Sequence, residues 1–180
     1  MNRSVPEPDE LEARLAELHE ASYGWACSCC GWNETDAEDV LQTTYVKVIS
    51  GRARYAGRST FRTWLFGVIR HTARELTRSM VSQRERAEGF ALEVVATGTP
   101  VAEPSEKIEH AERASLLRSA LETLPGRQRE VLHLVFYQDL TVQEAADVME
   151  VSIGSARVHY DRGKKRLRSL LGDARSGGDL

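Results

Sequence analysis

The chain has 180 residues and a formal net charge of −3, and 41% of its residues are hydrophobic, an ordinary fraction for a soluble globular protein. It has no run of about 18 apolar residues and an acidic N-terminus, so we expect neither a membrane-spanning helix nor a secretory signal, and we expect a cytoplasmic protein. Three cysteines, an odd number, argue against a disulfide framework.

The small net charge conceals a strong asymmetry along the chain. Residues 1–40 contain ten acidic and two basic residues, whereas residues 47–78 contain eight basic residues and one acid, Glu75. Phosphate binding depends on local rather than total charge. The basic segment therefore indicates a nucleic-acid contact that the overall charge would not reveal.

Three helices are predicted in the first 80 residues, at 11–30, at 36–49 and from about 60 to 78. A loop over 51–59 precedes the third helix, and Ser59 or Thr60 is placed to cap it. In the loop, Tyr55 could either stack a base or cover the core. Each helix has apolar residues at helical spacing, namely Leu11, Leu15 and Leu18, then Val40, Leu41, Thr44, Tyr45 and Val48, then Phe61, Trp64, Leu65, Val68 and Ile69.

The periodic pattern ends at residues 81–107, which hold two glycines, two prolines and mostly acidic charge. This composition predicts a flexible linker, with a frayed helical extension at its start as an option. Helices resume at 108–124 and 128–136, with Pro125-Gly126 between them, and residues 173–180 are expected to fray. No segment alternates with period two. We therefore predict an all-α fold of two small helical domains, residues 1–80 and 108–172, joined by a flexible acidic linker.

Residues 139–171 predict a helix-turn-helix. Thr141 and Glu144 have the spacing of a capping box, and Ser152 can cap a second, strongly basic helix. A capped helix, a tight turn and a basic helix are typical of a domain whose second helix enters the DNA major groove. The residues expected to face inward are Ala145, Ala146, Val148 and Met149 in the first helix and Val158, Leu167 and Leu170 in the second.

The cysteines Cys27, Cys29 and Cys30, with His19 upstream, raise the question of a metal or redox site. On one helix, His19 and Cys27 would lie about 12 Å apart, and Cys29 would point to the opposite side from Cys27. Only Cys27 and Cys30 share a face, and two ligands do not close a tetrahedral structural site. We therefore favour small buried hydrophobic side chains and expect no metal, and we keep a thiol sensor or metal ligand as the alternative.

These segments, in this order, resemble the small bacterial sigma factors of the extracytoplasmic-function group, in the sigma-70 family. The resemblance rests on D-A-E-D-V-L-Q-T-T-Y-V-K-V at 36–48, G-R-S-T-F-R-T-W-L-F-G-V-I-R-H-T-A at 57–73, and L-E-T-L-P-G-R-Q-R-E-V-L at 121–132 with the helix-turn-helix after it. It implies a subunit that directs core RNA polymerase to promoters and helps to open the −10 DNA. It implies no catalysis by this chain and no cofactor.

The implied partners are core RNA polymerase, through its β′ clamp helices and β flap, and promoter DNA. We also hypothesise an anti-sigma factor that clamps the two domains and masks both DNA-binding surfaces. The polymerase would contact a polar edge formed by Asp36, Glu38, Asp39 and Gln42. From the residues alone, this acidic turn is better explained as a solvated helix start that the helix dipole favours.

Two further surfaces are implied for DNA. The −10 element would be melted and read by a cationic, aromatic surface made of Arg54, Arg58, Ser59, Thr60, Trp64, Arg70, His71 and Arg74, although its helical spacing favours a core role for Trp64. The −35 element would be read by the basic helix, where an arginine can bind guanine and lysines grip phosphates. The residues implied there are Ser155, Arg157, His159, Arg162, Lys164 and Lys165.

The chain departs from the family at His71, Glu75 and Glu150, where the family often has Asn, Asp and Gly. If Glu150 takes a positive φ, it costs more than Gly would. The alternative function is a stand-alone helix-turn-helix regulator with an N-terminal sensing domain, which would have no need for the basic, aromatic segment 52–78. An enzyme has little support, because the sequence has no Gly-rich phosphate loop and no HExxH, and His133 lies in an apolar stretch that favours a structural role.

Overall fold

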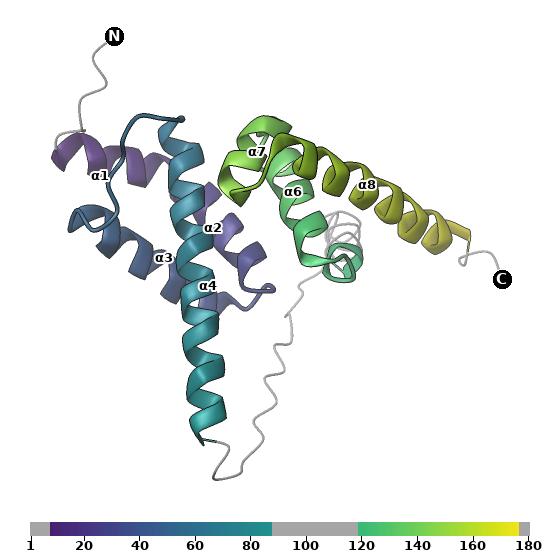
Figure 1. Ribbon diagram of the computed structural model, residues 1–180, viewed down its shortest axis with the longest axis horizontal. Coiled ribbons are helices and arrows are strands. Elements are labelled where there is room, and N and C mark those ends of the chain that lie inside the picture. Colours follow the sequence, from purple (N-terminus) through teal and green to yellow (C-terminus); the bar gives the residue numbers. More distant parts are fainter. Residues whose placement is uncertain (1–7, 88–118, 177–180) are drawn as a thin grey trace, which may run out of the picture.

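The computed structural model describes residues 8–87 and 119–176, and these residues contain helices and turns but no strand. The helices fall into an N-terminal half (α1–α4) and a C-terminal half (α6–α8), as Figure 1 shows. The predicted all-α class is therefore confirmed. The helices are α1 (Pro8–Glu17), α2 (His19–Cys29), α3 (Glu34–Ile49), α4 (Phe61–Ala87), α6 (Gly126–Phe136), α7 (Val142–Met149) and α8 (Ile153–Ser176).

The N-terminal half is built around Trp25, whose side chain is fully buried and whose indole N–H donates to the carbonyl oxygen of Phe66 over 3.0 Å. This bond fixes α2 against α4, and α3 packs on both. The single helix predicted over 11–30 is wrong, because the chain breaks at Leu18 into α1 and α2. Neither Gly nor Pro marks the break, and Leu18 makes no side-chain cap. The helical spacing of the leucines continues across the break, so the sequence does not indicate it.

Polar caps define where α3 and α4 begin. Asn33 accepts a hydrogen bond from the backbone N–H of Asp36, so α3 starts at Glu34, two residues before the predicted start. Thr60, one of the two predicted caps, accepts from the backbone N–H of Thr63 over 3.1 Å. At its other end α4 continues to Ala87, beyond the predicted end near residue 78. Residues 79–87 lack an apolar stripe, but most are good helix formers, so the helix persists by propensity.

The C-terminal half contains the predicted helix-turn-helix. Thr141 and Glu144 form both hydrogen bonds of a capping box, and Ser152 accepts from the backbone N–H of Ser155 over 3.1 Å. All four residues predicted to face inward from α7 are buried. Glu150 ends α7 in the left-handed region, at φ 54°. It therefore takes the positive φ at which a glutamate costs more than a glycine.

The inner face of α8 differs from the prediction. Val158 was expected to face inward, but it is 46% exposed, whereas Ala156 and Gly163 are buried. A Cβ added to Gly163 would lie 3.0 Å from Cδ1 of Leu132, so the missing side chain lets α8 approach α6 closely. Small residues, rather than the nearest large aliphatic one, therefore define the packed face, and Val158 lies on the opposite side of the helix.

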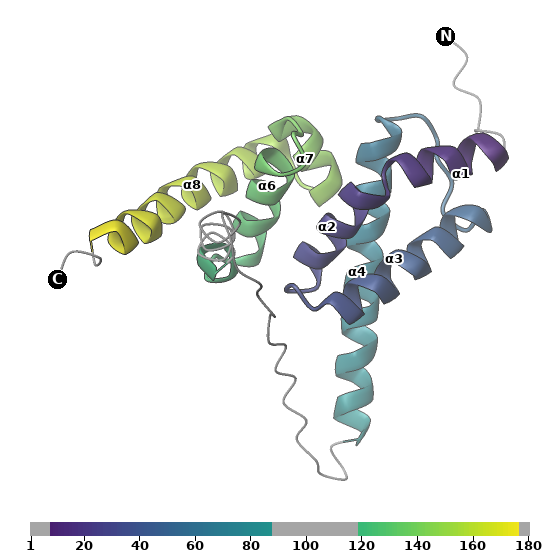
Figure 2. The same ribbon diagram turned by 180° about the vertical axis from the view of Figure 1, so that it is seen from behind.

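The two halves pack together, with α7 against α4 and α6 against α2, while α8 points away from α1–α4 (Figures 1 and 2). Of the predicted linker, residues 81–87 belong to α4 and the rest lie outside the described residues. The predicted helix over 108–124 is described only from residue 119, and the predicted tail only to residue 176. Within the described part of the chain, no helix is long and apolar enough to cross a membrane.

His133 sits in the contact between the halves and is structural, as expected. Its ring lies 5.4 Å from that of Trp25 and 6.0 Å from that of Trp32, both in the N-terminal half, and it stacks on Tyr137 at 5.1 Å. Its Nε2 lies 3.2 Å from the side-chain amide of Gln138. Burial lowers the pKa of His133 to about 4, so the native protein holds a neutral imidazole at pH 7.

This burial predicts a loss of stability in mild acid. The unfolded chain binds a proton at His133 below pH of about 6.5, whereas the native state resists protonation down to about pH 4. Stability that is present above pH 6.5 is therefore lost as the pH falls, by up to about 3 kcal/mol. We expect the urea-unfolding free energy of wild type to fall by about 2–3 kcal/mol more than that of His133→Asn between pH 6.5 and 4.5. The same dependence of unfolding free energy on pH in wild type and His133→Asn would contradict this prediction. Gln143→Ala, on the exposed face of α7, serves as the control.

Candidate nucleic-acid interface

The loop between α3 and α4 carries predicted −10 residues at its surface. Arg54, Arg58 and Thr60 are exposed, and Ser59 is half-buried. The loop is held by Tyr55, whose hydroxyl donates to the carbonyl oxygen of Ser59 over 2.6 Å. This bond leaves the cations of the loop free to contact a ligand while the backbone beneath them is fixed.

Three aromatic rings support the loop from below. Tyr55 lies edge-on to Phe61, with ring centroids 5.4 Å apart, and Trp64 packs at 5.4 Å from Tyr55 and 5.2 Å from Phe61. Phe61 is buried, whereas Trp64 is half-buried. Of the two roles left open for Tyr55, the structure therefore favours covering the core, and Trp64 keeps a partly open ring.

A cavity of about 530 Å³ lies beside this cluster. Ser59, Trp64 and His71 line it from the N-terminal half, and Asp147 and Glu150 line it from the C-terminal half. An aromatic ring, a hydroxyl and nearby cations are the groups that hold an unstacked base of a single strand. The N-terminal side of the cavity has this composition, whereas its C-terminal side is acidic.

The remaining predicted −10 residues lie along α4 and differ in access. His71 is exposed and its Nδ1 lies 3.5 Å from Oε1 of Glu75. Glu75 also pairs with Lys47 of α3, and this hydrogen bond and charge lower the pKa of the Glu75 carboxyl. Glu75, where the family often has Asp, therefore ties α3 to α4.

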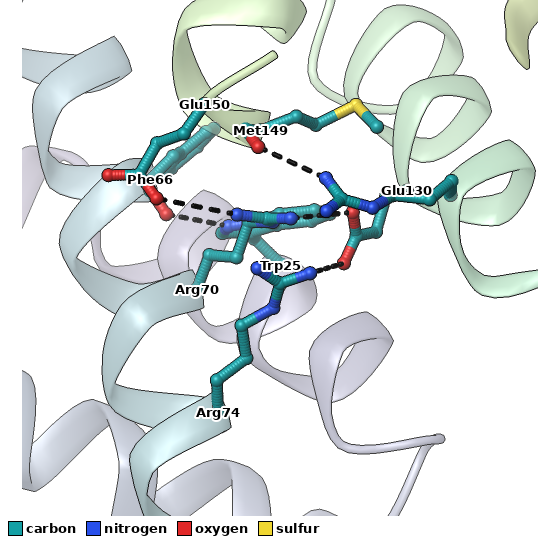
Figure 3. Close-up of polar contacts among 8 residues, drawn as sticks. Trp25, Phe66, Arg70, Arg74, Glu130, Met149 and Glu150 are labelled. Carbon is teal, nitrogen blue, oxygen red and sulfur yellow. Dashed lines mark hydrogen bonds and ion pairs between the residues drawn. The ribbon is translucent and has the colours of Figure 1, made fainter.

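Arg70 and Arg74 contact the C-terminal half (Figure 3). Arg70 is only 2% exposed, and its Nη2 lies 3.2 Å from Oε2 of Glu130. Arg74 lies 3.8 Å from the other oxygen of Glu130, and burial, with Arg70 close by, lowers the pKa of Arg74. In this arrangement Arg70 is covered, so any DNA contact by Arg70 requires the halves to separate.

The predicted polymerase-binding residues lie at the start and on the outer face of α3. Glu38, Asp39 and Gln42 are exposed, and Asp36 is half-buried. The apolar stripe expected beside them is core, because Val40 and Leu41 are buried. The exposed apolar groups of α3 are instead Val46 and Ile49, which share a face with Glu38 and Gln42. Sequence reasoning missed these two, although their spacing of four and seven residues from Gln42 was a readable signal.

The predicted −35 residues lie on α8, and all but His159 lie away from its packed face; His159, three residues after Ala156 and four before Gly163, lies at the edge of that face. Ser155, Arg157, Arg162 and Lys165 are exposed, and His159 is half-buried. Lys164 is also half-buried and lies over the ring of Tyr160, with Nζ 5.0 Å from its centroid. Val158 lies on the exposed face, between Ser155 and Arg162 along the helix. An exposed valine at the start of a groove-reading helix can contact the methyl group of thymine.

The cysteines do not form a metal cluster: the part of the chain that the structure describes contains no group of three or more potential metal ligands. Cys27 is buried, and Cys29 and Cys30 are half-buried at the end of α2. Burial raises the pKa of Cys29 well above its usual value and that of Cys30 to about 12. A protonated thiol is a poor nucleophile, so this environment favours packing over redox sensing.

Comparisons with known families match both halves. Residues 16–82 match the family model for sigma-70 region 2, and residues 114–167 match that for sigma-70 region 4. The chain is 31% identical over 137 residues to the RNA polymerase sigma factor CarQ of Myxococcus xanthus, covering 76% of this chain and 75% of that protein. It is 29% identical over 140 residues to the ECF RNA polymerase sigma factor SigX of Bacillus subtilis, covering 77% and 72%.

Two solved structures have the same fold. One is the sigma factor RpoE in complex with the anti-sigma factor NepR from Bartonella quintana, with a TM-score of 0.69 and 22% identity over 89% of this chain and 96% of that chain. The other is CnrH in complex with the cytosolic domain of CnrY, with a TM-score of 0.64 and 23% identity over 93% and 90%. At these identities the likeness concerns the fold.

The position of Val158 predicts a thymine contact in duplex DNA. Replacing the contacted thymine by deoxyuridine removes its methyl group and should weaken binding about fourfold, the value of one buried methylene. Val158→Ala should bind the two duplexes equally, as measured by competition binding. Lys165→Ala should weaken both duplexes while keeping the preference for thymine. If Lys165→Ala loses the preference for thymine over deoxyuridine and Val158→Ala keeps it, the thymine contact belongs to Lys165 and not to Val158.

Proposed function

This chain belongs to the extracytoplasmic-function group of the sigma-70 family, and we propose specific residues for each of its contacts with polymerase and promoter. It is a sigma factor: it binds core RNA polymerase and directs it to promoter DNA. The chemistry of RNA synthesis belongs to the polymerase, and the task of this chain is to position that enzyme and to hold opened DNA. We place this activity in the cytoplasm, together with the polymerase.

The observation that carries the residue assignments is the cavity beside the basic loop. Opening a duplex requires a site for an unstacked base and cations for the released strand. Trp64 and Ser59 line the cavity, and Arg54, Arg58 and Thr60 are exposed on the loop above it. We assign the flipped base to the cavity and the phosphates of the non-template strand to the loop arginines. A stand-alone regulator, which binds only duplex DNA, would have no use for this surface.

Along α4, His71 lines the cavity, and Arg70 and Arg74 lie one turn apart beside it in sequence. Two arginines and an imidazole in this position suit the phosphates and base edges at the upstream end of the bubble. His71 is accessible as the protein stands, whereas Arg70 becomes available only when Glu130 moves away. The −10 surface is therefore divided into an open loop and a covered helical part.

The −35 element is assigned to α8. Arg162 is exposed and lies roughly 100–120° around the helix from the packed Ala156 and Gly163, so it can reach a guanine edge. Ser155, Arg157, Val158 and His159 are the other candidates for base contact. Lys164 and Lys165 are assigned to phosphates, which set the register of the helix without reading sequence.

The polymerase contact is assigned to the exposed face of α3. Glu38, Asp39 and Gln42 supply charge and polarity, with Asp36 at the helix start, and Val46 and Ile49 supply an exposed apolar area next to them. An apolar patch with a polar rim is the usual composition of a protein–protein interface. We assign this face to the β′ clamp helices and the C-terminal domain to the β flap.

We also propose an anti-sigma partner. Both structural neighbours are complexes with a second protein, the anti-sigma factor NepR in one and the cytosolic domain of CnrY in the other. A protein of this kind would hold the halves of this chain together and cover the −10 and −35 surfaces. Co-purification of the tagged chain with the product of a neighbouring gene, and loss of transcription when that product is added, would test this.

Run-off transcription with core RNA polymerase and a library of promoter fragments tests the function and yields its consensus. We expect Arg162→Ala to relax the preference at one −35 position by about 5–150-fold, which corresponds to 1–3 kcal/mol. Lys165→Ala should lower initiation evenly across promoters. If both variants shift the consensus alike, or neither does, the division between base and phosphate contacts on α8 is wrong.

The −10 assignment has a separate readout. Permanganate reactivity of unpaired thymines reports opening of the −10 region. Arg58→Ala should reduce this reactivity while leaving −35 duplex binding unchanged, because α8 is remote from the loop (Figure 2). Gln143→Ala, on the exposed face of α7, is the matched control. Normal opening by Arg58→Ala would exclude that residue from the strand contact.

A further inference from the structure

Glu150 occupies a backbone position that glycine would fill with less strain. It caps α7 with φ 54° and ψ 47°, in the left-handed region. Among the described residues, only two other non-glycine residues have a positive φ, Trp32 and Asp139. The turn itself therefore does not require a glutamate, and its side chain needs another explanation.

The carboxylate of Glu150 faces an arginine of the other half. Its Oε2 lies 3.9 Å from Nη1 of Arg70, and Oε2 of Glu130 lies 3.2 Å from Nη2 of the same guanidinium. Figure 3 shows Arg70 and Arg74 on one helix, opposite Glu130 and Glu150 from the C-terminal half. Two cations of α4 thus meet two carboxylates that come from α6 and from the turn after α7.

The burial of Arg70 depends mainly on Glu130, because the side chain of Glu150 is 73% exposed and lies farther away, at 3.9 Å. A guanidinium that is 2% exposed is stable only beside negative charge, so the closed arrangement and the ion pairs require each other. The fit is incomplete, because the Nε of Arg70 is buried without a hydrogen-bond partner. A buried charge with an unsatisfied donor favours a contact that can be exchanged for a better one.

The rest of the contact between the halves includes further polar bonds. Gln138 donates to the carbonyl oxygen of Ala21 over 3.2 Å and accepts from Arg62 over 3.1 Å. These groups can bond to water when the halves part. Apolar contact comes from the rings of Trp25, Trp32 and His133. The contact therefore combines a few polar bonds with buried apolar packing, and Phe66 of α4 and Met149 of α7 belong to one buried core cluster.

The same turn covers the −10 surface. Asp147 and Glu150 form the acidic side of the cavity that Ser59 and Trp64 line. A DNA strand that entered the cavity would meet two carboxylates, and one of them, that of Glu150, lies 3.9 Å from Arg70. By contrast, among the described helices α8 packs mainly on α6 and α7, and its basic residues Arg157, Arg162 and Lys165 are exposed there.

We propose that the free chain inhibits its own −10 recognition, with Glu150 and Glu130 acting as an intramolecular latch that occupies Arg70 and Arg74 in place of DNA. This latch rests on the proposed assignment of Arg70 and Arg74 to −10 DNA. It acts on the −10 surface alone and leaves −35 binding available. Binding of polymerase or of the −10 strand releases the latch by offering the arginines a different set of negative charges or by separating the halves.

The test uses the full-length chain with Glu150→Gln, which keeps the strained backbone, and Glu150→Gly, which relieves it. Both remove the charge, so both should open the latch. Asp139→Gly is the matched control, because Asp139 also has a positive φ, at 49°, but makes no ion pair within the described residues. This control separates relief of backbone strain from loss of the carboxylate.

The first readout needs no DNA. Amide hydrogen exchange along α4 and α7 and the radius of gyration from X-ray scattering report whether the halves are in contact. We expect faster amide exchange at the α4–α7 contact and a larger radius of gyration in both Glu150 variants. The same changes are expected in the double variant Glu130→Gln, Glu150→Gln. Unchanged exchange and radius in all of them, or an equal change in Asp139→Gly, would overturn the latch.

The second readout is binding of a single-stranded −10 non-template oligonucleotide and of a −35 duplex, both taken from a promoter selected by run-off transcription. If about one molecule in ten is open, removing the latch should tighten single-strand binding by up to about tenfold and leave duplex binding unchanged. Opening without tighter binding would overturn the inhibitory role.

A final variant separates the latch from the proposed function. In the doubly substituted Glu130→Gln, Glu150→Gln protein, Arg74→Ala should weaken single-strand binding. If the halves open but Arg74→Ala has no effect, the −10 assignment of the arginines fails, and the contact between the halves remains as a structural one.

Discussion

A guanidinium that has lost its water must be matched by negative charge, and the arrangement of the two halves follows from how this chain meets that requirement for Arg70. The charge comes from Glu130 and Glu150, which belong to the other half of the chain. One residue of α4 thereby links the −10 surface to the position of the helix-turn-helix. Separation of the halves exposes the arginine to water or to phosphate, either of which replaces the lost carboxylates.

The chain carries a net charge of −3, and three of its acidic residues neutralise basic residues of α3 and α4. Its acidic residues are placed against its basic ones: Glu75 pairs with Lys47, Glu130 with Arg70 and Arg74, and Glu150 with Arg70. The cations of the loop and of α8 form no such pairs within the described residues. The basic groups are therefore divided into a set that is always available and a set that is neutralised within the chain.

Local chemistry made much of the fold predictable. The capping box at Thr141 and Glu144, the cap at Ser152 and the buried face of α7 depend only on residues within a few positions of one another, and each was predicted correctly. For α4 the prediction left Ser59 and Thr60 open, and the structure selects Thr60. The break at Leu18 could not be predicted, because it comes from α1 and α2 packing differently against the rest of the half and not from a local breaker. The sequence predicts an inward Val158 because valine is hydrophobic. In the structure, α8 packs closely on Leu132 of α6, and the small residues Gly163 and Ala156 form the buried face.

The candidate site was predictable to the same extent. The basic loop and the basic helix could be read from charge clustering, but the burial of Arg70 could not, because its partners lie 60 and 80 positions away in the sequence. From the sequence, Glu150 could be recognised only as a departure from the glycine that the family often has. A glutamate there strains the backbone, and the sequence indicated no interaction that would offset this strain. The structure supplies the benefit, since a carboxylate at that turn reaches α4 and a glycine would not. A residue that is unfavourable for its own turn is therefore understood only together with the opposite half of the chain, where it neutralises a charge that the DNA would otherwise meet.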